Sequence, residues 1–304
     1  PVAQELGDQE LLVAPSYLIG LALCFSGKLG AARRLLGLSL DPMEKLGMPV
    51  DWQRGLLFHA LAVGEGGDYK GALAMMARAR AHAERMGQKV LLSMSELMHG
   101  ALYRAGADWQ AALVAGERAA SLSRQTNEKV YLFAGLSLTA WAHSYQGRHD
   151  LSRVFRKEAI AIAQEMGGRV STGDWFDASD AELALLAGEN EQALSLASER
   201  AAIFRKSELL MGLGIVERAW GCALSRLGTS AAESDAHLAQ SIEVCRSGDM
   251  KLGIAQTHMW WARICRERGE EAEAQRHRDA SCEGFRAAGC EEGIATVQEF
   301  LASR

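Results

Sequence analysis

The sequence predicts an all-α protein, a right-handed solenoid of about seven helical hairpins followed by a terminal helix. Three observations lead to this prediction. The chain of 304 residues contains only 4 prolines, so long helices meet few interruptions. Small residues recur with a period of about forty, and each period contains two amphipathic stretches. With 48% hydrophobic and 23% charged residues, the chain has enough apolar side chains for a packed core.

The repeat is visible in four columns of residues that keep the same step. The first column holds turn-like residues: Gly7, Gly47, Gly87, Asn127, Gly167, Ser207, Gly248 and Gly289. The second holds small residues: Gly20, Ala60, Gly100, Ala140, Ala181, Gly221 and Ala262. The third is Gly27, Gly67, Ala107, Gly147, Gly188, Gly228 and Gly269, and the fourth is Ala32, Ala72, Ala112, Ser152, Ala193, Ala236 and Ala274. Four columns in step indicate a true internal repeat.

Each unit is expected to form two antiparallel helices. Stretches such as 90–104 place apolar residues at i, i+3, i+4 and i+7, which is typical of an amphipathic helix A. A short glycine-containing turn such as 66–68 follows, and then a second amphipathic helix B such as 111–124. Small residues at mid-helix A and early helix B allow the two axes to approach closely. The predicted units are 7–46, 47–86, 87–126, 127–166, 167–206, 207–247 and 248–288, with a terminal helix at 289–304, in a single solenoid over 1–304.

Two units depart from the pattern. In the first unit, Asp41, Pro42 and Glu44 combine an N-cap acid, a proline suited to the first helical position and a capping-box glutamate. Its helix B is therefore expected to break near Leu38 and to restart at Asp41 with a kink. In the sixth unit, residues 229–235 lengthen the turn by about three residues.

The unit resembles the tetratricopeptide repeat (TPR). It has a small residue at mid-helix A, a glycine before the turn, an aromatic or long residue after it (Tyr69, Trp109, His149) and an alanine three positions later. The resemblance covers nearly the whole chain. Units of about forty residues rather than thirty-four imply a longer helix B. This longer unit is similar to the MalT-like TPR regions that follow nucleotide-binding modules in bacterial signal-transduction ATPases, LuxR-type regulators and cyclase- or kinase-linked ATPases.

The two ends of the sequence suggest a C-terminal fragment of a larger protein. Residues 285–289 and the apolar helix that follows, up to Leu301, resemble the ends of such regulators. The chain begins at Pro1, and residues 2–6 resemble the last turn of a helix B. An ATPase, cyclase or kinase module is then expected upstream.

Charge and composition argue against several classes of partner. The formal net charge is −5 with no block of like charge, so neither nucleic acid nor an anionic membrane is expected as a partner of this segment. The stretch 11–27 contains Pro15 and polar residues, and no signal peptide is evident. The 6 cysteines form no CxxC motif, which favours reduced thiols and a cytoplasmic protein.

No motif predicts catalysis, and no cofactor or metal is expected. The glycine-rich segment 64–68 is not followed by the Gly-Lys-Ser/Thr of a phosphate-binding loop. The 8 histidines form no HExxH motif. Asp174, Asp177, Asp180 and Glu182 form an acidic cluster that could attract a cation. The alternative is that Asp174 caps a helix and the other carboxylates favour its N-terminal end or face water.

The remaining function is surface recognition. In a TPR superhelix the A helices line the concave face, and this resemblance implies the following inward residues: Arg54, Met94, Arg104, Trp141, Tyr145, Trp175, Glu182, Arg218, Met259, Arg263 and Arg266. Aromatic side chains in the middle and arginines towards the C-terminal end would suit a peptide, a protein segment or a small anionic effector. The alternative is that tryptophan and methionine at helical spacing belong to the core between repeats.

Two functions follow from this interpretation. The first is a non-catalytic sensor and scaffold segment of a bacterial multidomain signalling or transcription regulator. The second is a stand-alone TPR adaptor or receptor for a peptide or protein partner.

Overall fold

The computed structural model describes residues 9–168, 170 and 173–302. Within these residues it contains helices and no strands, which confirms the predicted all-α solenoid. The helices are α2 Gln9–Phe25, α3 Leu29–Lys45, α4 Pro49–Glu65, α5 Tyr69–Met86, α6 Lys89–Ala105, α7 Trp109–Thr126, α8 Lys129–Tyr145, α9 His149–Glu165, α10 Gly173–Leu186, α11 Asn190–Lys206, α12 Leu210–Arg226, α13 Ala231–Ser247, α14 Lys251–Glu267, α15 Glu271–Ala288 and α16 Glu291–Ala302. They form seven hairpins, from α2–α3 to α14–α15, and α16 is the terminal helix. The expected helical turn at residues 2–6, the first turn residue Gly7 and the side chain of Asp174 lie outside the described residues.

The small-residue column lies where neighbouring helices approach each other closely. A Cβ atom on Gly100 would lie 2.3 Å from Cδ2 of Leu138, and one on Gly221 would lie 2.7 Å from the backbone oxygen of Ser234. The alanines of the same column are completely buried: Ala60, Ala140, Ala181 and Ala262. Larger side chains at these positions would push neighbouring helices apart.

The turn within each hairpin depends on a left-handed residue. Every member of the third column has a φ between 60° and 104°, including the one alanine, Ala107. The turns between hairpins follow the predicted column except at two places. Ser207 and Gly248 keep a negative φ, at −95° and −88°, so the left-handed residue is the next one, Glu208 or Asp249.

The predicted break in the first helix B is wrong. Helix α3 runs without interruption from Leu29 to Lys45, with Pro42 inside it. Proline removes one backbone donor, and the carbonyl that loses its partner belongs to Leu38, whose side chain is 73% exposed. On the opposite face Leu36, Ser39 and Met43 are buried against neighbouring helices and hold the helix together.

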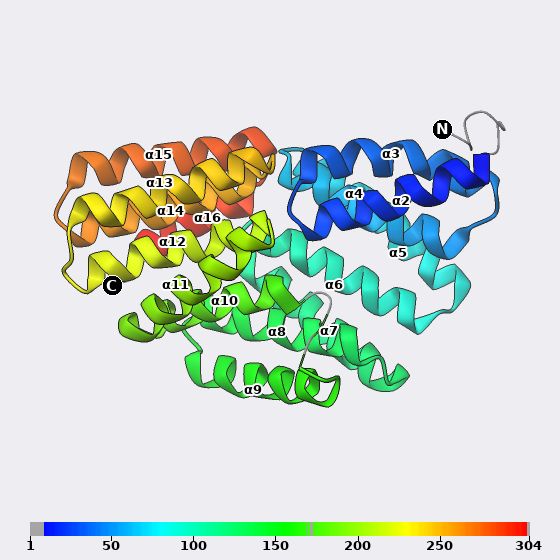
Figure 1. Ribbon diagram of the computed structural model, residues 1–304, viewed down its shortest axis with the longest axis horizontal. Coiled ribbons are helices and arrows are strands. Elements are labelled where there is room, and N and C mark those ends of the chain that lie inside the picture. Colours follow the sequence, from blue (N-terminus) through cyan, green and yellow to red (C-terminus); the bar gives the residue numbers. More distant parts are fainter. Residues whose placement is uncertain (1–8, 169, 171–172, 303–304) are drawn as a thin grey trace.

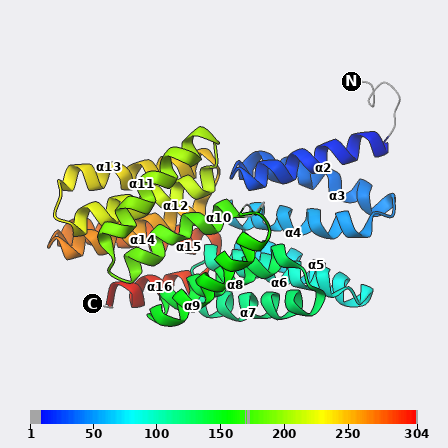
Figure 2. The same ribbon diagram turned by 60° about the horizontal axis from the view of Figure 1, so that its bottom comes forward.

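The solenoid closes on itself across its axis. The first helices, α2–α4, and the last units, α12–α15, form neighbouring groups whose helices meet at their ends in both views (Figure 1 and Figure 2). The backbone nitrogen of Leu29 donates to the carbonyl of Gly248 at 3.0 Å, and that of Leu210 donates to Ser26 at 2.8 Å. Helix α14 also packs against α4 and α6. The A helices of the two halves therefore face one another at short range.

The described helices include none that is both long and apolar enough to cross a membrane.

Candidate functional site

The predicted inward residues separate into three groups. Arg54, Met94 and Trp175 line an open cavity in the first half of the solenoid. Tyr145 and Arg263 line a hollow at the opposite edge. The others are buried between these two sites, except for one exposed arginine on α14. The buried ones are Arg104, Trp141, Glu182, Arg218 and Met259, and the exposed one is Arg266.

The inner cavity is formed by five A helices, α2, α4, α6, α8 and α10. Its volume is about 340 Å³, within the range of sites that hold small ligands. Its walls are mainly apolar and aromatic: Leu21, Phe25, Phe58, Val90, Met94, Leu97, Met98, Ala101, Val130, Tyr131, Trp175 and Phe176. We define this set, with Arg54 and Glu128, as the inner cavity.

Trp175 fixes one wall of the inner cavity by a contact across the solenoid axis. Its indole nitrogen donates a hydrogen bond to the backbone oxygen of Phe25 at 3.2 Å. The ring of Phe25 lies 5.9 Å from that of Trp175 and meets Phe58 edge-on at 5.2 Å. These rings join the first and fifth hairpins, so the cavity exists only because the solenoid curves back on itself.

The inner cavity contains one basic and one acidic side chain. Arg54 is partly buried and lies close to the hydroxyl groups of Tyr17 and Tyr131. Burial raises the pKa of Tyr17 to about 12 even though the Arg54 charge opposes this shift, so the phenol is neutral. Glu128 is the N-cap residue of α8. The two charges lie on a largely apolar lining.

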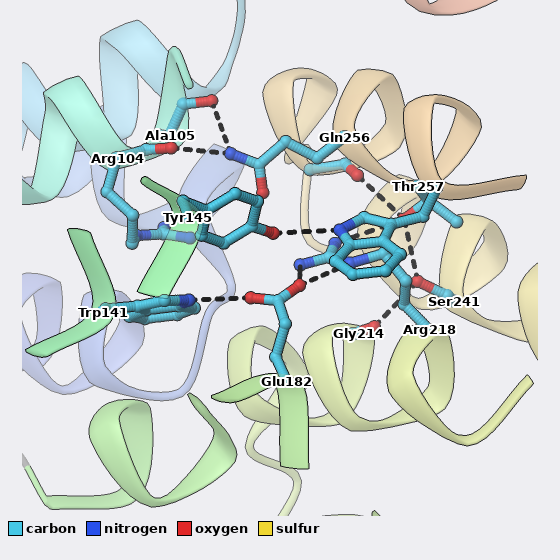
Figure 3. A network of polar contacts seen from close by, with 12 residues as sticks. Arg104, Ala105, Trp141, Tyr145, Glu182, Gly214, Arg218, Ser241, Gln256 and Thr257 are labelled. Atoms are coloured by element: carbon cyan, nitrogen blue, oxygen red, sulfur yellow. Dashed lines mark hydrogen bonds and ion pairs between the residues drawn. The ribbon is translucent and has the colours of Figure 1, made fainter. Parts of the chain in front are cut away.

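A buried ion-pair layer separates the inner cavity from the opposite edge of the solenoid. It consists of Glu65, Arg104, Trp141, Glu182 and Arg218, of which Figure 3 shows the last four. Arg104 pairs with Glu65 at 3.3 Å, and its guanidinium group lies 5.0 Å from the centre of the Trp141 ring. The Trp141 indole donates to Glu182 at 2.8 Å, and Glu182 also accepts from Arg218 at 2.8 Å. Charge and hydrogen-bonding capacity are thus largely satisfied within the layer.

The pKa shifts in this layer follow from burial and pairing. Burial raises the pKa of Glu65, against the opposing charge of Arg104, and it lowers the pKa of Arg104 itself. Burial would also lower the pKa of Arg218, but the Glu182 carboxylate outweighs this effect and the pKa ends above its ordinary value. Arg218 therefore stays protonated and charged at physiological pH.

The expectation that Trp141 faces an open groove is wrong. Its side chain is only 2% exposed, with Arg104 over its ring, Trp109 beside it and Glu182 bonded to its indole nitrogen. Gln256 on α14 donates to the carbonyl oxygens of Arg104 and Ala105 at 2.6 and 3.0 Å. Trp260 on the same helix donates to the Tyr145 hydroxyl at 2.9 Å. At this level the inner side of the solenoid is filled by side chains of facing helices.

The second hollow lies beyond the layer and has a volume of about 650 Å³. Tyr145 stacks on Trp109 with their ring centres 3.6 Å apart. Arg263 lies over the ring of Phe300 and pairs with Glu267 at 3.2 Å. The arginine of the second hollow, Arg263, therefore already has a carboxylate partner, unlike Arg54 of the inner cavity.

The acidic cluster does not form one group. Asp177 and Asp180 both pair with Arg156, at 3.0 and 2.6 Å, while Glu182 belongs to the buried ion-pair layer. An arginine of the chain thus occupies the position considered for a bound cation. Among the described residues, no three metal-ligating side chains come together.

Sequence reasoning missed most of the aromatic wall of the inner cavity. Phe58 and Met98 each follow a predicted residue, Arg54 and Met94, by four positions, so they lie one helical turn further on the same face. That spacing was a usable signal. Phe25 belongs to the first helix A, and no pattern in the sequence indicated that it would meet Trp175.

Comparison with known proteins supports the fold. No protein-family model matches the chain, and no curated protein matches it by sequence. A solved structure, a Rap protein complexed with Competence and Sporulation Factor, is similar with a TM-score of 0.64 and 13% identity, covering 95% of this chain and 80% of that chain. The fold is a TPR-like solenoid. At this level of identity the likeness concerns the fold alone.

Proposed function

We propose that this chain is a non-catalytic repeat protein that binds a peptide or protein segment in the inner cavity. The observation that carries the proposal is the cavity itself, an apolar hollow of about 340 Å³ built from five successive A helices. Aromatic and methionine side chains offer a large contact area for apolar groups. The similar Rap protein is complexed with Competence and Sporulation Factor, which supports a binding role for the shared architecture.

The buried ion-pair layer gives this role a mechanical basis. It fixes the A helices relative to one another, so the cavity is held in shape before a ligand arrives and less ordering is needed on binding. We further infer that the chain acts as the sensor and scaffold segment of a signalling or transcription regulator, as the MalT-like resemblance implies. Occupancy of the cavity would then be relayed to another module.

Blocking the cavity tests the proposal. Val90 is 37% exposed at the edge of the cavity, so Val90→Trp is expected to fill the entrance without disturbing the core. Val154→Trp is the matched control, because Val154 is 61% exposed on α9 and is not part of the cavity. Each immobilised variant is exposed to a pool of short N-acetylated peptides, and retained peptides are identified by mass spectrometry. Retention by the parent and by Val154→Trp, with loss in Val90→Trp, is expected; equal retention by Val90→Trp would contradict the proposed site.

A further inference from the structure

Arg54 differs in its partners from the three other inward arginines that are buried or half-buried. Arg104, Arg218 and Arg263 each form an ion pair with a glutamate of the chain, at 3.3, 2.8 and 3.2 Å. At Arg54 no carboxylate of the described residues lies within ion-pair distance. Its charge interacts with nearby tyrosine hydroxyls and, more weakly, with the carboxylate of Asp51 in the first turn of the same helix. Partial burial against an apolar lining weakens its hydration, so this guanidinium group is available for an anion.

The N-terminal ends of two helices near Arg54 also favour a bound anion. Val90 and Val130 lie in the first turns of α6 and α8, so the positive ends of two helix dipoles border the cavity. Neither N-cap side chain, Gln88 or Glu128, bonds to the backbone N–H groups of its own helix. These groups add to the attraction of a negative charge near Arg54. Glu128 opposes it and restricts the position that an anion can take.

The rest of the cavity determines what must accompany the anion. Apart from Arg54 and Glu128, the lining is aliphatic, aromatic or methionine, with the Tyr131 hydroxyl turned to the sulfur of Met94 at 3.5 Å. A ligand that is only anionic would leave this surface unfilled, and a ligand that is only apolar would leave Arg54 without a carboxylate partner. A bulky apolar side chain next to a free carboxylate satisfies both requirements, as at the C-terminus of a peptide.

We propose that the inner cavity selects peptides by their C-terminus, with a bulky apolar last side chain in the aromatic pocket and the terminal carboxylate on Arg54. This inference rests on the proposed function and adds the ligand class. Arginine can donate two parallel hydrogen bonds to a carboxylate, which lysine cannot do. The recognition should therefore depend on the guanidinium group as well as on charge.

Two peptide pools that differ only at their ends test this inference. Both pools are N-acetylated and end in an equal mixture of Leu, Ile, Val, Met, Phe and Trp, but one has a free carboxylate and the other a C-terminal amide. The parent is expected to retain the acid pool about tenfold more strongly than the amide pool. Arg54→Gln should abolish this preference, and Arg54→Lys should restore part of it. Glu128→Gln should strengthen retention of the acid pool because it removes a repelling charge.

The controls distinguish failure of C-terminal selection from failure of peptide binding as a whole. Arg266→Gln changes an exposed arginine outside the cavity and should behave as the parent. Thermal unfolding followed by circular dichroism verifies that each variant is folded. Equal retention of both pools by the parent would overturn C-terminal selection and leave peptide binding intact, whereas retention of neither pool would overturn both. Loss of retention in Glu128→Gln but not in Arg54→Gln would also overturn the inference, because a cation of the ligand would then be recognised.

Discussion

The carboxylate of Glu182 lies 2.8 Å from the guanidinium group of Arg218, and both side chains are almost completely removed from solvent. Glu182 is on α10 and Arg218 is on α12, so the pair joins the fifth and sixth hairpins. Trp141 on α8 donates to the same carboxylate. One acidic side chain thus connects three consecutive A helices on the inner side of the solenoid.

Removing this carboxylate is expected to be strongly destabilising. Glu182→Ala leaves the Arg218 guanidinium buried without its partner and should lower the free energy of unfolding by about 3–5 kcal/mol. The double variant Glu182→Leu with Arg218→Met removes both charges and should recover most of that loss. Urea denaturation followed by circular dichroism measures the change.

An exposed pair provides the control. Arg124 and Glu158 also lie close together, at 2.6 Å, but the side chains are 49% and 42% exposed. Glu158→Ala should change the free energy of unfolding by less than about 1 kcal/mol. If Glu182→Ala proves as mild as Glu158→Ala, the ion pair is not the stabilising connection described above.

Two glycines in A helices should respond oppositely to alanine. At Gly221 a Cβ would lie 2.7 Å from the backbone oxygen of Ser234, and the resulting overpacking should destabilise the fold by about 1–3 kcal/mol. At Gly55 the nearest atom would be 3.4 Å away, so alanine should be neutral or stabilise by up to about 1 kcal/mol through helix propensity. Chemical denaturation of the two variants checks this prediction. A Gly221→Ala variant as stable as the parent would refute the close approach of α12 and α13.

His277 should make the protein sensitive to acid. It stacks on Trp261 with ring centres 4.1 Å apart, and its Nδ1 atom lies 2.9 Å from that of His258. Burial lowers its pKa from 6.5 to about 4, with further lowering by His258, Arg276 and Arg268. The unfolded chain therefore binds more protons than the folded chain between these pH values, and stability falls as the pH falls through this range.

The variant His277→Phe tests this dependence because it keeps an aromatic ring over Trp261 and removes the titrating group. The loss of unfolding free energy between neutral pH and pH 4 should be smaller in the variant than in the parent. The comparison uses the change with pH within each protein, so a difference in stability at neutral pH does not affect it. Identical losses would show that His277 does not contribute.

Thiol reactivity should report on the buried core. All 6 cysteines are free, and only Cys282 is partly exposed. Burial raises the pKa of Cys24, Cys222 and Cys245 to about 12, which suppresses the reactive thiolate. Ellman's reagent should therefore react rapidly with one thiol in the folded protein, and Cys282→Ser should remove that fast phase. Several fast-reacting thiols in the folded parent would be incompatible with the described packing.

The helix contacts and turns of this fold were predictable because residues close together in the sequence determine them. The spacing of small residues identified the helix contacts at Gly100 and Gly221, and the glycine column identified the left-handed turns. Pro42 was misjudged because its helix is stabilised by burial of Leu36 and Met43, which no local signal reveals. Tertiary packing here outweighs the preference of proline for a helix start.

The candidate site was predictable only in part. Equivalent positions on successive A helices brought Arg54 and Met94 to the same cavity. The closure of the solenoid was not predictable, because Gln256 meets the backbone of Arg104 across 152 residues of sequence. Small rotations between repeats add up over the array and decide which inward side chains stay open and which, like Trp141, become covered.

The most direct test of the account asks which part of the inner face a ligand touches. Met94 and Met98 line the inner cavity, whereas Met259 is completely buried on α14, outside the cavity lining. Methyl-labelled methionine allows their NMR signals to be followed separately after assignment by single substitution. On addition of the peptide that the parent retains most strongly, the signals of Met94 and Met98 should shift while that of Met259 stays in place. A shift at Met259 with unchanged signals from Met94 and Met98 would contradict the assignment of binding to the inner cavity.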